Sequence, residues 1–171
     1  MISVILEEEL LQRYRGKKVL VDSNLLLLLL IGSYDPSLIA RFKRVGKYSV
    51  DDFELLRTFV LLFATVVTAP HVLTEVSNLA NSLGSQIKEQ WFGHFRTTLQ
   101  LFEEHPLKAQ NLSTKDEFLA FGLTDAALCA LCGEVLLVTE DYKLSGFLQS
   151  KNLPVINFSD IRALQKLLYE R

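Results

Sequence analysis

The stretch KKVLVDSNLLLLLLI, residues 17–31, decides the fold of this chain. Its first part is a short run with β-branched residues, which predicts a buried strand, and a run of leucines that favours a helix follows directly. Asp22 and Asn24 interrupt the apolar residues at the junction. An acid between two apolar runs has no solvated face to turn to, so it needs a cationic partner. The stretch therefore predicts a buried strand, a buried helix and a carboxylate with a special role between them.

The same stretch is the segment that most resembles a membrane span. It offers thirteen residues from Val19 to Ile31, interrupted by Asp22 and Asn24, whereas a spanning helix needs about 20 apolar residues. The start of the chain, MISVILEEELLQRY, carries three consecutive glutamates where a cleavable signal peptide would be apolar. We therefore expect no membrane association and a cytoplasmic location.

Composition indicates an ordinary globular protein. The chain has 171 residues, of which 49% are hydrophobic and 22% charged, and this length favours a single domain over residues 1–171. The formal net charge of −2 gives no overall attraction for nucleic acid. Any surface that binds a polyanion must therefore be local.

Short apolar runs alternate with helical patterns along the chain, which predicts a three-layer α/β/α fold around a central, mostly parallel sheet of about five strands. Strands are expected at KKVLVD, ATVVTAP, residues 108–111, EVLLVT and LPVIN. Helices are expected at 2–12, 25–31, 50–63, the segment after Pro70, 85–103, 113–121, 124–132, 142–150 and 159–171, the last capped by Ser159.

Four acidic residues stand where an apolar strand would end or a helix would begin. They are Asp22, Glu75, Asp125 and Asp141. In parallel sheets, sites form beyond the carboxyl ends of the strands, so these four side chains have a geometric reason to meet. Oxygen ligands of this kind suit Mg²⁺ or Mn²⁺. The pattern predicts metal-assisted chemistry on a phosphate.

The segments VDSNLLLLLL, VLTEVSNLA, GLTDAALCAL and LLVTEDYKL occur in this order and together resemble the PIN-domain nucleases over residues 18–158. The resemblance implies a PIN-like fold whose acids bind one or two Mg²⁺ or Mn²⁺ ions and hydrolyse phosphodiester bonds, usually in RNA. Compared with compact bacterial members, the chain carries extra helical material around residues 33–52 and 80–105.

The resemblance also implies a role for each matched residue. Asp22 would be the metal ligand of the first strand, supported by Asn24. Glu75 would be a ligand or would orient water, and Asp125 would be the second main ligand. Asp141 would serve a second ion or an outer shell, with Thr139 as its hydroxyl partner. The extra acid Glu140 is expected to point away from the site, although it could also replace or disturb Asp141.

Plainer interpretations stand beside these. Asp125 and Asp141 could each be a first-turn carboxylate favoured by the helix dipole. Cys129 and Cys132 are best explained as thiols of the core. A basic stretch, formed by Arg41, Lys43, Arg44 and Lys47, could be a solvated surface or could grip an RNA backbone.

The resulting prediction is a metal-dependent ribonuclease, cleaving within the strand. Two settings are open: a toxin with an inhibitory antitoxin protein and a homodimeric state, or a stand-alone enzyme of RNA processing or decay. A non-catalytic scaffold that binds RNA or protein is the main alternative. A phosphatase with an aspartyl nucleophile at Asp22 is a weaker one, because that chemistry usually wants a second aspartate where Asn24 stands.

Overall fold

A parallel β-sheet forms the centre of the molecule. The computed structural model describes residues 9–169, and within them five strands form one sheet in the order β3-β2-β1-β4-β5, with every neighbouring pair parallel. The predicted α/β architecture is therefore confirmed. The strands are β1 (Lys18–Val21), β2 (Thr65–Thr68), β3 (Glu103–Glu104), β4 (Leu136–Thr139) and β5 (Val155–Asn157).

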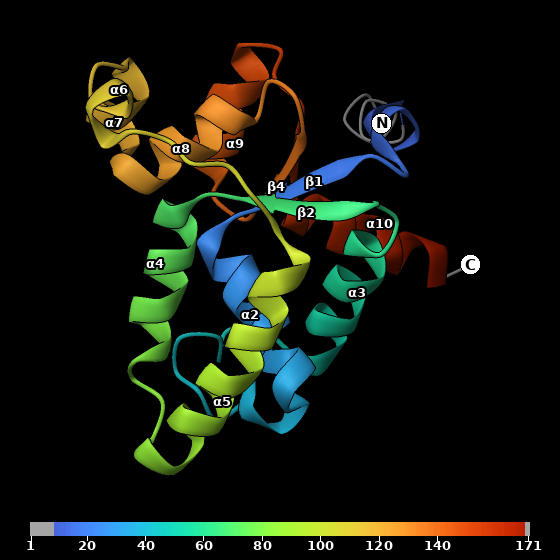
Figure 1. Cartoon of the computed structure of the whole chain (residues 1–171). Helices are drawn as coiled ribbons and strands as arrows, with labels where there is room; N and C mark the ends of the chain where they lie inside the picture. Colours follow the sequence, from blue (N-terminus) through green and yellow to red (C-terminus); the bar gives the residue numbers. More distant parts are fainter. Residues whose placement is uncertain (1–8, 170–171) are drawn as a thin grey trace.

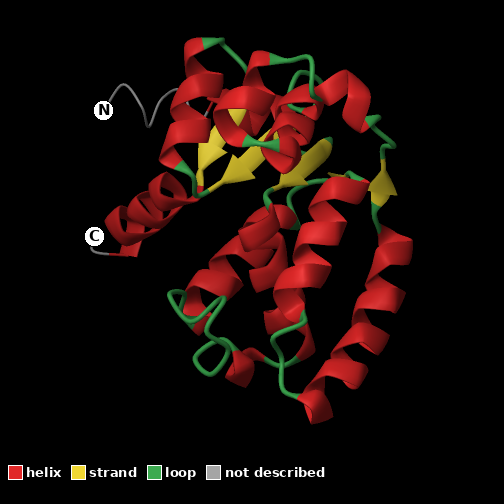
Figure 2. Cartoon of the chain, turned by 90° about the vertical axis from the view of Figure 1, so that its left-hand side faces the viewer, coloured by secondary structure: helices red, strands yellow, loops and turns green. Residues whose placement is uncertain are grey.

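Helices cover both faces of this sheet (Figures 1 and 2). In Figure 1, α6 to α9 lie above the sheet, and α2 to α5 form a longer body below it. The helices are α2 (Ser23–Tyr34), α3 (Val50–Val60), α4 (Pro70–Ala80), α5 (Ser85–Thr98), α6 (Ala109–Leu112), α7 (Asp116–Phe121), α8 (Leu123–Leu131), α9 (Tyr142–Ser150) and α10 (Phe158–Tyr169), with short 3-10 turns η1 (Pro36–Leu38) and η2 (Leu99–Leu101).

The leucine-rich helix α2 forms the core beneath the sheet. Most of its side chains are buried, including Leu25–Leu28, Leu30 and Ile31. A helix that is apolar on all sides must be covered on all sides, and α2 packs against α3, α4 and α5 as well as lying under the sheet. Because β1 leads straight into this enclosed helix, Asp22 is fixed at the junction.

The contact between α2 and α3 is so close that Gly32 admits no side chain. A Cβ atom on Gly32 would lie 2.3 Å from Cδ2 of Phe53, which belongs to α3 and is buried. We expect Gly32→Ala to lower the free energy of unfolding, because overpacking costs about 1–3 kcal/mol and the better helix propensity of alanine returns only about 1 kcal/mol. Gly146→Ala in α9 meets nothing within 4 Å and should be neutral or stabilising. Urea unfolding of both variants measures the difference, and equal midpoints would contradict this packing.

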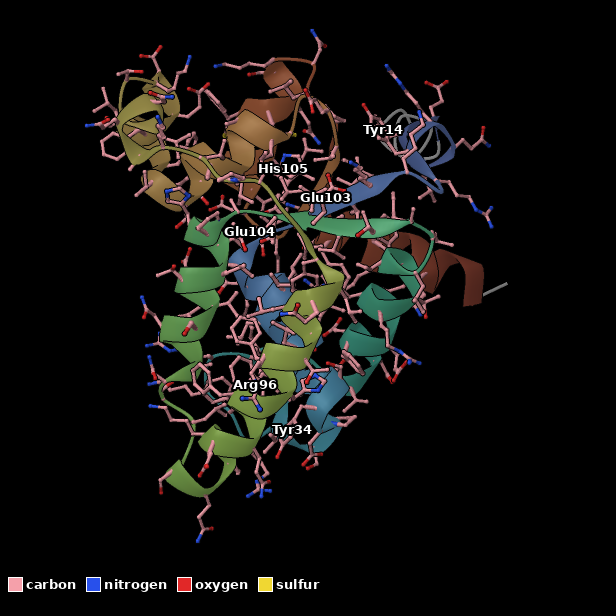
Figure 3. The ribbon with its side chains drawn as sticks, in the orientation of Figure 1. Tyr14, Tyr34, Arg96, Glu103, Glu104 and His105 are labelled. Atoms are coloured by element: carbon pink, nitrogen blue, oxygen red, sulfur yellow. The ribbon has the colours of Figure 1, made fainter. Side chains whose placement is uncertain are left out.

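Several predicted boundaries were wrong. Residues 108–111 are not a strand, because α6 occupies Ala109–Leu112. The edge strand is instead Glu103–Glu104, which pairs with Val67 and Thr68 of β2, and Figure 3 labels both glutamates there. The helix expected over 85–103 ends at Thr98. The helix expected over 50–63 ends at Val60. The helix expected over 113–121 begins only at Asp116.

The first and last helices differ from their predicted bounds or caps. The helix expected at 2–12 lies partly outside the described residues. Within the described part, residues 9–14 are helical. Ser159 was predicted to cap the last helix, but it lies inside α10, and the side chain of Asn157 accepts a hydrogen bond from its backbone N–H at 3.0 Å. Asn157 is therefore the residue that satisfies this helix start.

Three further features bear on the predictions. Segment 33–52 contains η1 and a run of turns, while segment 80–105 contains α5, η2 and the edge strand β3. Cys132 is buried and Cys129 half-buried, and both are free thiols, in agreement with a place in the core. Among the described helices, none combines the length and the apolar character needed to cross a bilayer.

Candidate metal centre

Asp22 occupies the junction between β1 and α2. It is 7% exposed, and its Oδ1 accepts the N–H of Leu25 at 2.8 Å as the N-cap of α2. Its Oδ2 accepts the hydroxyl of Thr139 at 2.5 Å and the N–H of Glu140 at 3.0 Å. Burial raises the pKa of Asp22 above its usual value, while these three hydrogen bonds act in the opposite direction. The carboxylate is thus held rigidly at the carboxyl end of the central strand.

Thr139 joins two of the four acids. Its hydroxyl donates to Asp22 and accepts the backbone N–H of Asp141 at 3.0 Å. Thr139 was predicted to be the hydroxyl partner of the Asp141 carboxylate; in the structure it contacts only the backbone N–H of Asp141, and the hydroxyl proton goes to Asp22. Since β1 and β4 are neighbours in the sheet, this link fixes the relative positions of their two ends.

Asp141 fits both interpretations, as a carboxylate that stabilises a helix start and as a residue with an oxygen available to a ligand. Its Oδ1 accepts the backbone N–H groups of Lys143 at 2.7 Å and Leu144 at 3.0 Å, so Asp141 caps α9. The side chain is exposed. Its other oxygen, Oδ2, accepts no hydrogen bond from the described residues and stays available to an additional ligand.

Glu75 lies on α4, the helix that follows β2. Pro70 occupies the first turn of α4, as predicted, which places Glu75 about one and a half turns along. Glu75 Oε2 accepts the hydroxyl of Ser23 at 3.0 Å. Ser23 follows Asp22 directly and is buried, so α4 brings Glu75 next to the first acid.

Asp125 lies in the first turn of α8 and is half-buried. Its pKa is raised to about 6, first by burial and then by the negative charges of Glu75, Asp141 and Asp22. A helix dipole would favour the ionised form and lower this pKa. Burial and the charges of the other three acids, which lie within electrostatic range, thus act against the ionised form that the plainer interpretation of Asp125 requires.

The four carboxylates thus gather near the carboxyl ends of the strands, and their negative charges repel one another. As they lie, no three His, Cys, Asp or Glu side chains in the described part of the chain are arranged closely enough to hold a metal ion. The donor set nevertheless has the right chemistry, because carboxylate and hydroxyl oxygens are preferred by hard divalent cations. A cation between them would relieve the repulsion that raises the pKa of Asp125. The chemistry of the donors therefore suits such an ion, whereas the arrangement of the described side chains is not that of a ready-made site.

The side chain of Glu140 is held by partners outside the four acids, while the pKa of Asp22, raised mainly by burial, is raised further by the negative charge of Glu140. Its carboxylate accepts hydrogen bonds from Tyr48 at 2.7 Å and Lys47 at 2.5 Å, and it also pairs with Arg162 of α10. Arg162 lies 3.6 Å from Asp52 of α3 as well. The side chain of Glu140 is thus fully engaged, while its backbone N–H still supports Asp22.

Asn24 does not hydrogen-bond to Asp22 in the described structure and so does not take the supporting position predicted for it. It is exposed and lines a separate pocket with Arg41, Lys43 and Arg44, while Lys47 pairs with Glu140 instead. The predicted basic group of four is therefore divided between two places. Lys47 reaches the residue next to Asp141, and Asn24 follows Ser23, whose hydroxyl donates to Glu75.

Sequence reasoning missed several residues around the acids. Ser23 could have been noticed, because a hydroxyl beside a buried acid is a natural partner for another carboxylate. Tyr48 and Arg162 gave no local signal, since their role depends on contacts with Glu140, which lies 92 and 22 residues away. Thr74 lines a pocket of about 500 Å³ beside Glu75 together with His71, for which the sequence favoured a surface or capping role; His71 Nδ1 is buried without a hydrogen-bond partner among the described residues.

Comparison with models of known protein families found no match, and comparison with curated proteins found no similar sequence. The function must therefore be argued from the site itself.

Proposed function

We propose that the protein is a divalent-metal-dependent nuclease of the PIN type that hydrolyses phosphodiester bonds within RNA. The observation that supports this most directly is the pKa of Asp125, raised to about 6 by burial and by the charges of Glu75, Asp141 and Asp22. Perturbed acids that gather at the carboxyl end of a parallel sheet are typical of functional sites.

Each side chain has a defined task in this proposal. Asp22 and Asp125 are the main ligands of Mg²⁺ or Mn²⁺, Glu75 completes the site or orients water, and Asp141 offers its free oxygen to a second ion. When bound, such an ion neutralises charge on the phosphoryl oxygens and makes its own water more acidic. Thr139 and the N–H of Glu140 keep the Asp22 carboxylate fixed throughout.

The test is incubation of single-stranded and structured RNA with the protein in Mn²⁺, in Mg²⁺ or in EDTA. We expect cleavage with either ion and none in EDTA. Because water is the attacking group, strands with 2′-O-methyl nucleotides should also be cut, which excludes a contaminating nuclease that uses the 2′-hydroxyl. Asp22→Asn should abolish cleavage by the same preparation.

Asp22→Asn needs a folding control, because both oxygens of Asp22 accept hydrogen bonds and an amide would set an N–H against another donor. Circular dichroism and a melting curve provide it. Cleavage that persists in EDTA, or that a folded Asp22→Asn variant retains, would refute the nuclease proposal.

One observation favours a second candidate, a non-catalytic protein that binds RNA. The carboxylates, as they lie in the described structure, are not arranged to hold an ion. Calorimetric titration with Mn²⁺ separates the two, because a scaffold would show no binding that depends on Asp125. The phosphatase alternative is less well supported, since Asp22 is 7% exposed and directs both oxygens toward protein donors.

The biological setting is a separate matter. A toxin that forms a homodimer and is held by an antitoxin protein, and a stand-alone cytoplasmic enzyme of RNA processing, would both use the same chemistry at the same residues.

A further inference from the structure

A pocket of about 770 Å³ lies between the segment that joins α2 to α3 and the turn that joins α4 to α5. This is within the usual size range of ligand pockets. It is separate from the four acids, none of which lines it. Its lining is Asn24, Leu38, Arg41, Phe42, Lys43, Arg44, Leu79, Ser82, Leu83, Gly84 and Ile87.

Three cations line this pocket and have no carboxylate partner among the described residues. Arg41, Lys43 and Arg44 are exposed, and none of them forms an ion pair with a carboxylate of the described residues. By contrast, Lys47 in the same segment pairs with Glu140, at 2.5 Å. In a chain of net charge −2, three unpaired cations at one pocket give a local field that attracts an anion.

The remainder of the lining is largely apolar. Leu38, Phe42 and Leu83 are buried, whereas Leu79 and Ile87 are half-buried. A simple inorganic anion would gain nothing from this surface. A ligand that joins a negative group to a flat apolar one would use both parts, and a nucleotide is such a ligand.

The pocket adjoins the acids along two helices. On α2, Asn24 follows Ser23, whose hydroxyl donates to Glu75. On α4, Leu79 lies four residues after Glu75 and therefore on the same face, one turn further along. A chain that enters the pocket can thus continue directly to the carboxylates.

We infer that this pocket binds one nucleotide unit of single-stranded RNA beside the phosphate that is to be cleaved. The phosphate contacts Arg41, Lys43 and Arg44, and the base lies on the surface of Leu79, Leu83 and Ile87. The strand must be single, because a duplex keeps its bases stacked and paired and cannot present one to an apolar surface. The assignment of RNA rests on the proposed function, but the binding itself requires no metal ion.

The test is binding of a fluorescent single-stranded oligoribonucleotide, measured by anisotropy with the wild-type protein in EDTA. The triple variant Arg41→Gln, Lys43→Gln, Arg44→Gln should bind at least about tenfold more weakly, and the slope of log K against log salt should fall by about 2, near 0.7 for each lost contact.

The matched control is Arg13→Gln, Arg15→Gln, Lys17→Gln. These three cations have the same total charge and are exposed, and Arg13 and Lys17 lie over the ring of Tyr14. Figure 3 shows Tyr14 on the side of the sheet opposite the α2–α5 body. We expect this variant to bind as the wild type does. If both triple variants bound RNA equally weakly, the loss would be explained by total charge alone, and the inference would be overturned.

A second variant tests the apolar surface. Ile87→Ala should weaken binding of the normal strand and leave an abasic strand of equal length unaffected. If Ile87→Ala has no effect on either, or if duplex RNA binds as tightly as the single strand, the nucleotide pocket is refuted. Because all of these measurements are made without metal, a protein that binds in this way but never cleaves would refute only the nuclease proposal.

Discussion

The Asp125→Asn variant is expected to be more stable than the wild type at neutral pH in the absence of metal, and to lose more than about a hundredfold of its metal-dependent cleavage. The folded protein raises the pKa of Asp125 to about 6 from an ordinary value of 3.8. The folded state therefore holds the proton more tightly than the unfolded state does. Wild-type stability should fall as pH rises from about 4 to about 6 and then level off. Asparagine removes this fall, because it has no proton to lose.

Denaturant unfolding in EDTA between pH 4 and pH 8 measures the effect. The neighbouring helix α7 offers a matched control in Asp116, which is also a first-turn acid but is exposed. Asp116→Asn should leave the slope of stability against pH unchanged. If Asp125→Asn were destabilising at neutral pH, the plainer interpretation of Asp125 as a dipole-stabilised carboxylate would be right.

Metal gives an independent measurement of the same residue. An ion bound by the folded state alone raises the melting temperature by an amount that grows with the logarithm of the ion concentration divided by its Kd. We expect Mn²⁺ to stabilise the wild type above pH 6 and to stabilise Asp125→Asn much less. This readout does not depend on catalysis, so it separates a failed metal site from an unsuitable RNA substrate.

The second large effect is expected at Thr139. Thr139→Val keeps the shape of the side chain but removes the hydroxyl that donates to Asp22 and accepts from the N–H of Asp141. Because Thr139 is 0% exposed, water cannot replace the lost bonds, and we expect a loss of about 1–3 kcal/mol in the free energy of unfolding. Cleavage should fall by about tenfold to a hundredfold, since Asp22 is no longer held in place.

Thr139→Ser is the matched control, because it keeps the hydroxyl and removes only a methyl group. It should recover most of the activity, with a smaller loss of stability from the vacated space. The assays are denaturant unfolding and cleavage rates over a range of metal concentrations. Equal activity of the Val and Ser variants would show that the hydroxyl does not position Asp22.

Much of the fold could be predicted because its signals are local. The run from Lys17 to Ile31 combined a strand, an acid and a fully apolar helix, and the structure has all three in order. Helix 142–150 was predicted at its true bounds. The edge strand could not be predicted, since Glu103 and Glu104 are poor strand formers and are recruited by pairing with β2. The strand predicted at residues 108–111 was wrong for the opposite reason. Its local pattern was weak, and the segment forms helix α6 instead.

The candidate site was predictable in its residue types but not in its connections. The four acids were named because carboxylates beside apolar runs are conspicuous, and in the structure the charges of Glu75, Asp141 and Asp22 act on Asp125. The Thr139 hydroxyl donates to Asp22 because β4 lies next to β1 in the sheet. Strand order cannot be derived from sequence spacing, so this partner could not be predicted. The place of Asn24 and the division of the basic group likewise depended on how the segment after α2 folds back.

The bond between Thr139 and Asp22 spans 117 positions of the chain, and the central strand β1 lies between β2 and β4. During synthesis, β1 therefore waits for one of its two neighbours until nearly the whole polypeptide has emerged. Until then Asp22 lacks the Thr139 hydroxyl and the N–H of Glu140, so the acidic cluster is assembled only once the sheet is complete.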